Sequence, residues 1–183
     1  MKRKHLPTQS QHTTYFLTTT VTESTRIFYQ KPLAQILLEN LSFYVTKFAI
    51  DLHGFVIMPT HIHVLTTMSK TSDVSKFMGK LKEYSAKQII KWCQEHNEEK
   101  LLEIFSTSAD KYSHTHQYQV WQKRFDELVI TTTKTFDIKL NYIHNNPAQE
   151  HWQLCARPEL YSFSSARYYV NGEDVGVPIT KLA

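Results

Sequence analysis

The spacing of hydrophobic and polar residues changes several times along the chain, and each change marks a predicted element. Residues 14–22 are rich in aromatic and β-branched side chains, which is typical of a strand. Between about 31 and 48, apolar residues recur at helical spacing, which predicts a helix. Residues 50–58 and 61–68 then have the composition of two strands with the short break Pro59-Thr60 between them, so this region predicts a hairpin.

The second half of the chain alternates between helical and strand-like stretches. Residues 73–96 predict a long helix, for which Ser72 or Asp73 would serve as the N-cap. The polar stretch 95–117 has no clear period and is expected to be mostly loop. The remaining predicted elements are a strand over 118–131, a third helix over 135–146 that Pro147 ends, and a short helix near 164–169.

The order strand, helix, strand, strand, helix, strand, helix predicts an α+β fold. Its first six elements match the split βαβ, or ferredoxin-like, plan, in which an antiparallel sheet carries two helices on one face. The third helix is then an addition to that plan. We expect one domain over 1–183, with a flexible basic tail at 1–12 and a C-terminal extension over about 148–183.

Composition narrows the class of protein without naming a function. A chain of 183 residues with 41% hydrophobic residues can form an ordinary core, and no apolar run is long enough for a membrane helix. Cys93 and Cys155 lie far apart, so we expect free thiols in a reducing cytoplasm rather than a disulfide framework. The basic start of the chain has no apolar stretch behind it, which argues against a secretory signal. The formal charge of +4 is compatible with nucleic acid but does not require it.

Two histidines open the second strand of the predicted hairpin. Because strand side chains alternate between faces, His61 and His63 point the same way while Ile62 points into the opposite layer. Two imidazoles side by side on a rigid strand can act as neighbouring ligands of one metal ion. The alternative interpretation is a pair of surface histidines without a ligand.

The third predicted helix carries a second set of polar candidates. Tyr142 and Asn146 are four residues apart, so they share one face of the helix, beside the apolar stripe of Phe136, Leu140 and Ile143. Taken alone, Tyr142 has the simpler interpretation of a half-buried aromatic side chain, and Asn146 that of a helix terminator.

Together these stretches resemble the REP-associated tyrosine transposases, within the wider single-tyrosine transposases that carry a His-hydrophobic-His metal motif. The resemblance rests on FVIMPTHIHVL at 55–65, VWQKRF at 120–125 and YIHNNP at 142–147, and it extends from about Tyr15 to Tyr169. The sequence departs from the family pattern at Thr60, where an asparagine commonly stands, and at Ala148-Gln149-Glu150, where an apolar and basic run is usual.

The resemblance implies a metal-dependent enzyme that cuts and rejoins single-stranded DNA. Tyr142 would be the nucleophile that forms a 5′-phosphotyrosine, and His61, His63 and Asn146 would hold Mg²⁺ or Mn²⁺. The expected partner is single-stranded or hairpin DNA from repetitive palindromic elements, bound by a monomer or a homodimer in the cytoplasm, at the nucleoid. Candidate DNA contacts are Lys123, Arg124 and Trp121, together with Arg3 and Lys4 in the basic tail.

Two other functions are compatible with the same residues. A domesticated protein that binds DNA hairpins could keep the fold and lack efficient cleavage. A metal-dependent phosphoesterase could use activated water and leave Tyr142 without a role. Trapping of a covalent protein–DNA adduct separates both from the tyrosine enzyme.

Overall fold

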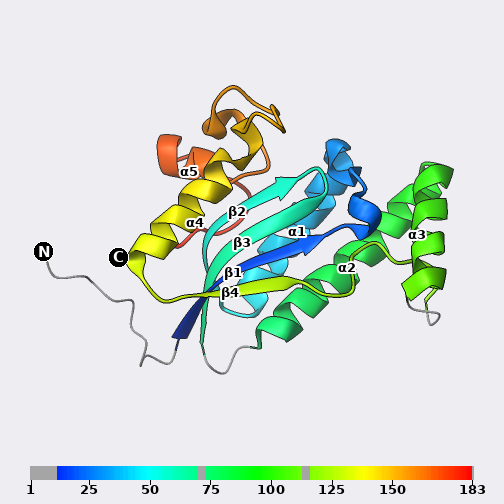
Figure 1. Ribbon diagram of the computed structural model, residues 1–183, viewed down its shortest axis with the longest axis horizontal. Helices are drawn as coiled ribbons and strands as arrows, with labels where there is room; N and C mark the ends of the chain where they lie inside the picture. Colours follow the sequence, from blue (N-terminus) through cyan, green and yellow to red (C-terminus); the bar gives the residue numbers. More distant parts are fainter. Residues whose placement is uncertain (1–11, 70–72, 113–115, 183) are drawn as a thin grey trace, which may run out of the picture.

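A four-stranded antiparallel sheet organises the protein. The computed structural model describes residues 12–69, 73–112 and 116–182, and its strands lie in the order β2-β3-β1-β4 (Figure 1). This order and the antiparallel pairing confirm the predicted α+β, ferredoxin-like plan. The strands are β1 (His12–Thr20), β2 (Asp51–Met58), β3 (His61–Ser69) and β4 (Asp126–Ile130).

Two long helices cover one face of the sheet, α1 (Lys31–Lys47) and α2 (Val74–Glu95) (Figure 1). The main hydrophobic core lies between these helices and alternate residues of the strands, among them Leu17, Ile62 and Val64. Asp73 caps α2 as predicted, since its side chain accepts hydrogen bonds from the first-turn backbone. Within the described residues no helix is long and apolar enough to cross a membrane.

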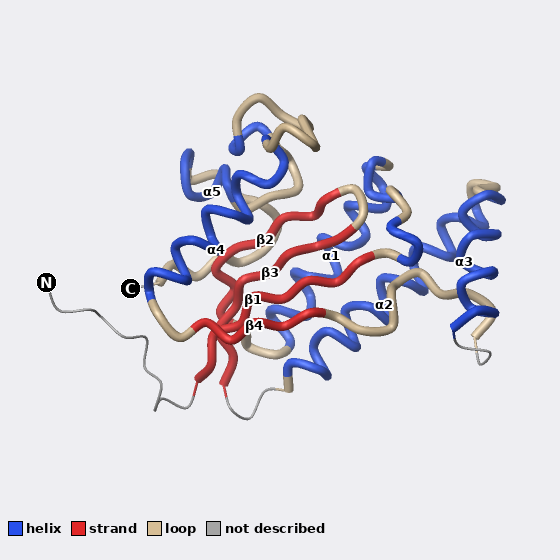
Figure 2. The backbone as a smooth tube through the Cα atoms, in the orientation of Figure 1, coloured by secondary structure: helices blue, strands red, loops and turns tan. Residues whose placement is uncertain are grey.

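A third helix, α4 (Thr133–Asn145), crosses the opposite face of the sheet (Figure 2). Phe136 and Ile143 of α4 pack with sheet residues in a smaller hydrophobic cluster. Helix α4 therefore turns its neighbouring polar residues toward a sheet face that α1 and α2 leave uncovered. The sheet members of this cluster are Phe16, Val56, Met58, Leu65 and Ile130.

Two segments differ from the sequence prediction. The stretch expected to be loop contains the helix α3 (Glu99–Tyr112), because one narrow apolar stripe that includes Phe105 and Ala109 is enough to dock it. The predicted strand over 118–131 pairs continuously only from Asp126 to Ile130. Its first part meets the sheet at a single bridge between Val21 and Trp121, since the indole turns into the core beneath the sheet.

The segment after α4 packs against the outer edge of β2. It contains the short helices η3 (Asn146–Ala148), η4 (Pro158–Leu160) and α5 (Ala166–Asn171), and η1 (Thr22–Ser24) and η2 (Ile27–Tyr29) precede α1. Backbone bonds to β2 cover an edge that would otherwise expose unpaired groups. They run from Ile57 to Phe163, from Ser165 to Phe55 and from Thr180 to Leu52.

His53 joins this C-terminal segment to the sheet and makes stability depend on pH. Its Nδ1 lies 2.7 Å from the carbonyl oxygen of Thr180 and its Nε2 2.8 Å from Thr67 Oγ1. Burial lowers the pKa of His53, against smaller opposing effects of the Thr180 hydrogen bond and Asp51. The unfolded chain therefore binds this proton more readily, and the stability that neutral His53 contributes is present above about pH 6.5 and lost below it.

We expect the unfolding free energy of the wild type to fall faster than that of His53→Gln as pH drops below about 6.5. The difference in slope is bounded by the one-proton limit of about 1.4 kcal/mol per pH unit. Urea denaturation of both proteins over a pH series measures it. Parallel pH profiles would show that His53 protonates as readily in the folded protein as in the unfolded chain.

Candidate active site between the sheet and helix α4

Strand β3 presents His61 and His63 on the sheet face that α4 crosses, while Ile62 is buried in the core on the other side. The two histidines stand at the start of β3, directly after the tight turn at Pro59 and Thr60. His63 lies between β1 and β2 in the sheet, so neighbouring strands support it on both sides. This is the alternation expected from the sequence.

Two threonine hydroxyls orient the imidazoles. Thr60 Oγ1 lies 2.8 Å from His61 Nδ1, and Thr18 Oγ1 lies 2.7 Å from His63 Nδ1. The two Nε2 atoms then face each other at 3.1 Å. When each Nδ1–H donates to its threonine, both Nε2 atoms carry lone pairs directed at one point, which is the tautomer that a metal ligand needs.

Both histidines are neutral in the folded protein. Burial lowers the pKa of His61 to about 4. Burial also lowers the pKa of His63 to about 3, with smaller contributions from His61 and from the ammonium group of Lys139. A neutral imidazole is the form that binds a cation, so the pair is prepared for a metal ion near neutral pH.

The donor set fits a divalent ion that keeps open positions. Two imidazole nitrogens about 2.1 Å from one ion lie about 3 Å apart when their bonds are near a right angle, which agrees with the observed separation of 3.1 Å. Among the described residues, no three side chains of the His, Cys, Asp and Glu types form a group that could hold a metal ion. A third protein ligand at this site must therefore be of another type, such as an amide.

Helix α4 brings Tyr142 to the histidines. Thr132 caps the helix, with its hydroxyl accepting from the backbone of Thr135. The Tyr142 ring lies 5.3 Å from the His63 ring and 6.1 Å from the Phe16 ring, measured between centroids, and the side chain stays 39% exposed. Tyr142 is thus held beside the metal-binding candidates and remains open to a substrate.

Asn146 follows one turn after Tyr142 at the C-terminal end of α4. It is 2% exposed, and its backbone N–H donates to the Tyr142 carbonyl, so it stays in register with the helix. Its side-chain amide makes no hydrogen bond with any described residue. Nearby, Trp152 lies 6.0 Å from His61 between ring centroids, so the chain after α4 passes the histidine pair.

The predicted DNA contacts have different environments. Trp121 is 4% exposed, donates through Nε1 to Ser85 and packs on Phe28, so its ring has no face open to a base. Lys123 and Arg124 are exposed in the segment that follows, where Gln122 bonds to Thr20 opposite His61. They therefore lie at the same end of the sheet as the histidines. Arg3 and Lys4 lie outside the described residues.

A comparison with models of protein families identifies the family of this chain. A family model described as "Transposase IS200 like" matches residues 9–108, more than half of the chain. The chain belongs to the IS200-like transposase family. The matched part of this transposase contains His61 and His63 and ends before α4, so Tyr142 and Asn146 rest on the geometry above.

One solved structure supports the same fold. The transposase superposes on a REP-associated tyrosine transposase bound to a REP hairpin with a TM-score of 0.62 and 18% identity, covering all of this chain and 93% of the other. A protein described as a transposase from Deinococcus radiodurans gives a TM-score of 0.47 and 19% identity over 79% of this chain and 97% of the other. No curated protein matches the sequence.

Several residues of the site were not evident from the sequence. Thr18 and Phe16 reach His63 only because β1 pairs with β3 in one particular register. Trp152 reaches His61 only because the chain turns back after α4. Thr60 departs from the family pattern, but its hydroxyl lies beside His61 Nδ1, so this position still provides a polar partner for the histidine.

Gly54 sets the distance of α4 from the sheet. A Cβ at this position would stand 2.7 Å from Leu140 Cδ1 and 3.3 Å from Ser165 Oγ.

We therefore expect Gly54→Val to displace α4 and lower DNA cleavage by about 10- to 100-fold, because a shift of roughly 1 Å misaligns a nucleophile. Mn²⁺ binding should weaken less than cleavage, because His61 and His63 stay on β3 while Asn146 moves with α4, and calorimetry with Mn²⁺ measures this. The matched control is Gly79→Val in α2, where a Cβ meets nothing within 4 Å. Equal cleavage in both variants would show that the position of α4 tolerates the change.

Proposed function

We propose that this IS200-like transposase cuts and rejoins single-stranded DNA through Tyr142, with a divalent ion held by His61, His63 and Asn146. The observation that carries the proposal is the position of the Tyr142 ring, 5.3 Å from the ring of His63, whose Nε2 faces that of His61. A partly exposed tyrosine and two neutral imidazoles from distant parts of the sequence thereby meet at one place.

The reaction proposed for this arrangement conserves the energy of the phosphodiester. Tyr142 Oη loses its proton and attacks phosphorus, which forms a 5′-phosphotyrosine and breaks the bond to the 3′ oxygen. That oxygen leaves and takes up a proton as a 3′-hydroxyl. Attack by a 3′-hydroxyl on the phosphotyrosine reverses the steps and rejoins DNA, so neither water nor a nucleotide is consumed.

The family resemblance favours Mg²⁺ or Mn²⁺ in this role, whereas the two imidazoles by themselves would equally suit zinc. A bound divalent ion supplies positive charge to the non-bridging oxygens of the scissile phosphate, where negative charge builds during attack. The chain's own contribution is to hold both imidazoles neutral and oriented by Thr60 and Thr18. The amide oxygen of Asn146 is a hard donor, which suits these ions.

Lys139 adds a fixed positive charge beside the nucleophile. Its Nζ lies 4.6 Å from the centroid of the Phe16 ring and 5.6 Å from that of Tyr142. Among the described residues no carboxylate lies within 4 Å of this ammonium group. It can therefore attract the phosphate and stabilise the phenolate that attacks it.

We expect Lys139→Met to lower the rate of DNA cleavage by about 10- to 100-fold. Lys139→Arg keeps the charge and should recover part of the rate, whereas Lys134→Met, on an exposed turn of the same helix, should have no effect. Single-turnover cleavage of a labelled strand measures all three. Identical rates for Lys139→Met and the wild type would remove Lys139 from the reaction.

The proposed substrate is a DNA hairpin with a single-stranded flank. The sequence resembles the REP-associated group, and one solved protein of the same fold is bound to a REP hairpin. Tyr142, His61 and His63 meet within one chain here, which supports a monomer over a homodimer that exchanges its tyrosine helices. Lys123 and Arg124 are candidates for contacts with the DNA backbone.

The deciding experiment incubates the protein with Mn²⁺ and labelled single-stranded hairpin DNA, then looks for an adduct that survives denaturation. Adduct and cleavage together support the tyrosine mechanism. Cleavage without an adduct indicates activated water, and tight binding without cleavage indicates a DNA-binding protein that no longer cuts.

A further inference from the structure

An aromatic and basic group lies beside the histidine pair, and the proposed chemistry does not use it. The Trp152 ring is 6.0 Å from the His61 ring. Arg26 Cζ is 5.8 Å from the Trp152 centroid, and the His151 ring is 5.6 Å from it. Arg26 and His151 are exposed, and Trp152 is half-buried.

Backbone hydrogen bonds attach Trp152 firmly to the end of α4. The N–H of Trp152 donates to Gln149, whose own N–H donates to Asn146, and the N–H of Leu154 donates to Pro147. One part of the indole packs on the small cluster beneath α4, and the rest is open. The ring is therefore pre-positioned a fixed distance from the proposed metal ligands.

Arg26, beside Trp152, is a cation without a carboxylate partner among the described residues. In the described part of the chain no carboxylate lies within 4 Å of its guanidinium group. The segment that carries it is bonded to the turn before His61, since the Phe28 N–H donates to the Pro59 carbonyl. A guanidinium group without a carboxylate partner beside a site for a phosphodiester is available to a phosphate.

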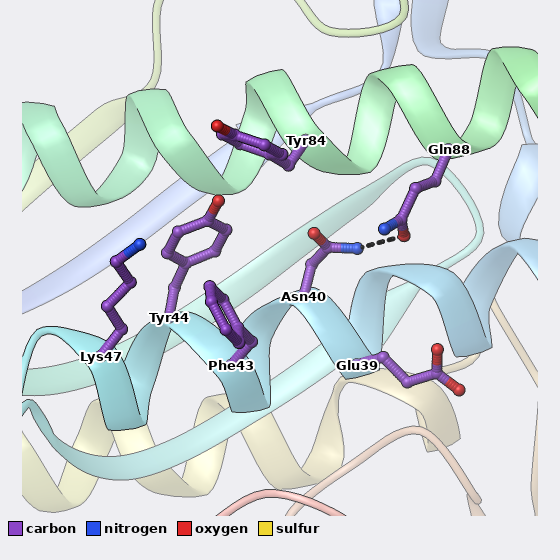
Figure 3. Close-up of a pocket in the computed structure, with 7 residues that line it drawn as sticks. All are labelled: Glu39, Asn40, Phe43, Tyr44, Lys47, Tyr84 and Gln88. Atoms are coloured by element: carbon purple, nitrogen blue, oxygen red, sulfur yellow. Dashed lines mark hydrogen bonds between the residues drawn. The ribbon is translucent and has the colours of Figure 1, made fainter.

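A second aromatic and basic cluster shows the contrast. Figure 3 shows Phe43, Tyr44 and Tyr84 around a hollow between α1 and α2. There Lys80 and Lys87, which approach the Tyr84 ring, are both paired with Glu83. Lys47 also lies over the Phe43 ring of this hollow. The hollow belongs to the helical side of the sheet, away from the histidines, so it lacks the position beside the proposed site.

We propose that Trp152 and Arg26 form a subsite for one unpaired nucleotide next to the scissile phosphate. The base stacks on the open part of the indole, and the guanidinium group pairs with a neighbouring phosphate. Every base has a face that can stack, so the subsite selects single-stranded over paired DNA rather than a particular sequence. The inference rests on the proposed function, because it assumes that a DNA strand passes His61 and His63.

The test measures binding, in a background that cannot cut. All proteins carry Tyr142→Phe, and the probe is labelled oligothymidylate with Mn²⁺ present. We expect Trp152→Leu to weaken binding about 5- to 50-fold and Trp152→Phe to recover most of it, because phenylalanine still offers a ring. Arg26→Gln should weaken binding and lower the slope of log affinity against log salt by about 0.7, the value for one lost phosphate contact on a single strand.

A matched control and a direct mapping complete the design. Trp92→Leu replaces another half-buried indole, one that stacks on His96 at the end of α2, and should leave binding unchanged. Oligothymidylate carrying 5-iodouracil should crosslink to Trp152 under ultraviolet light, which peptide mass spectrometry identifies. Unchanged affinity in Trp152→Leu, or crosslinks only at other residues, would overturn the subsite. Failure of the wild type to cut DNA would reject the proposed function while these binding results still stand.

Discussion

Tyr142→Phe removes the covalent protein–DNA adduct and lowers cleavage by about 10³-fold or more, because the reaction loses the oxygen that attacks phosphorus. The ring itself keeps its contacts with Phe16 and His63, so the variant should fold and bind DNA as the wild type does. Denaturing gel electrophoresis with labelled single-stranded hairpin DNA and Mn²⁺ detects both the adduct and the cut strand.

Tyr84→Phe is the matched control for this experiment. Tyr84 is 41% exposed, close to the 39% of Tyr142, and it lies on α2 against Tyr44, on the helical side of the sheet. It should cut at the wild-type rate and form the same adduct. Cleavage that persists in Tyr142→Phe would contradict the tyrosine mechanism and would point to activated water.

The second large effect concerns the metal. His63→Gln removes the more deeply enclosed of the two imidazoles and should abolish Mn²⁺ binding in calorimetry. Loss of a partner that merely orients a ligand typically costs about 10- to 100-fold, so loss of the ligand should lower cleavage by about 10²-fold or more. His61→Gln should act in the same direction, because Nε2 of each imidazole faces that of the other.

His96→Gln is the control for the metal experiment. His96 is exposed and stacks on Trp92 at the end of α2, so its loss should change neither Mn²⁺ binding nor cleavage. If His63→Gln still bound Mn²⁺ with wild-type affinity, the ion would have to bind elsewhere, and the histidine pair would serve only to position Tyr142 through the ring contact.

The elements with strong periodicity could be predicted from the sequence, and those held by tertiary contacts could not. Helix α1 and the hairpin of β2 and β3 appear where the apolar pattern places them, within a few residues. The sequence does not predict helix α3, because charged residues interrupt its apolar stripe and only its packing on the core makes the stripe evident. Trp121 is predicted from the sequence to stack on a base, but it is a core side chain. Its exposure depends on how the rest of the chain folds around it.

In the candidate site, too, the sequence predicts the local relations between residues but not the contacts between distant segments. Strand alternation alone placed His61 and His63 on one face, and helical spacing alone placed Tyr142 and Asn146 on another, because both relations are local. Only the resemblance to a known family indicates that the two motifs form one site. Their meeting depends on α4 crossing the free face of the sheet at Gly54, which is a contact between segments far apart in the sequence.

The sequence by itself thus determined the order of elements, the side on which each functional residue stands and the family pattern. Only the tertiary structure decided which groups complete the site. The hydroxyl of Thr18, the ammonium of Lys139 and the indole of Trp152 reach the histidines and tyrosine through strand register, helix docking and a returning loop. The physical reason is that local periodicity specifies direction within one element, whereas distance between elements is set by how their side chains pack.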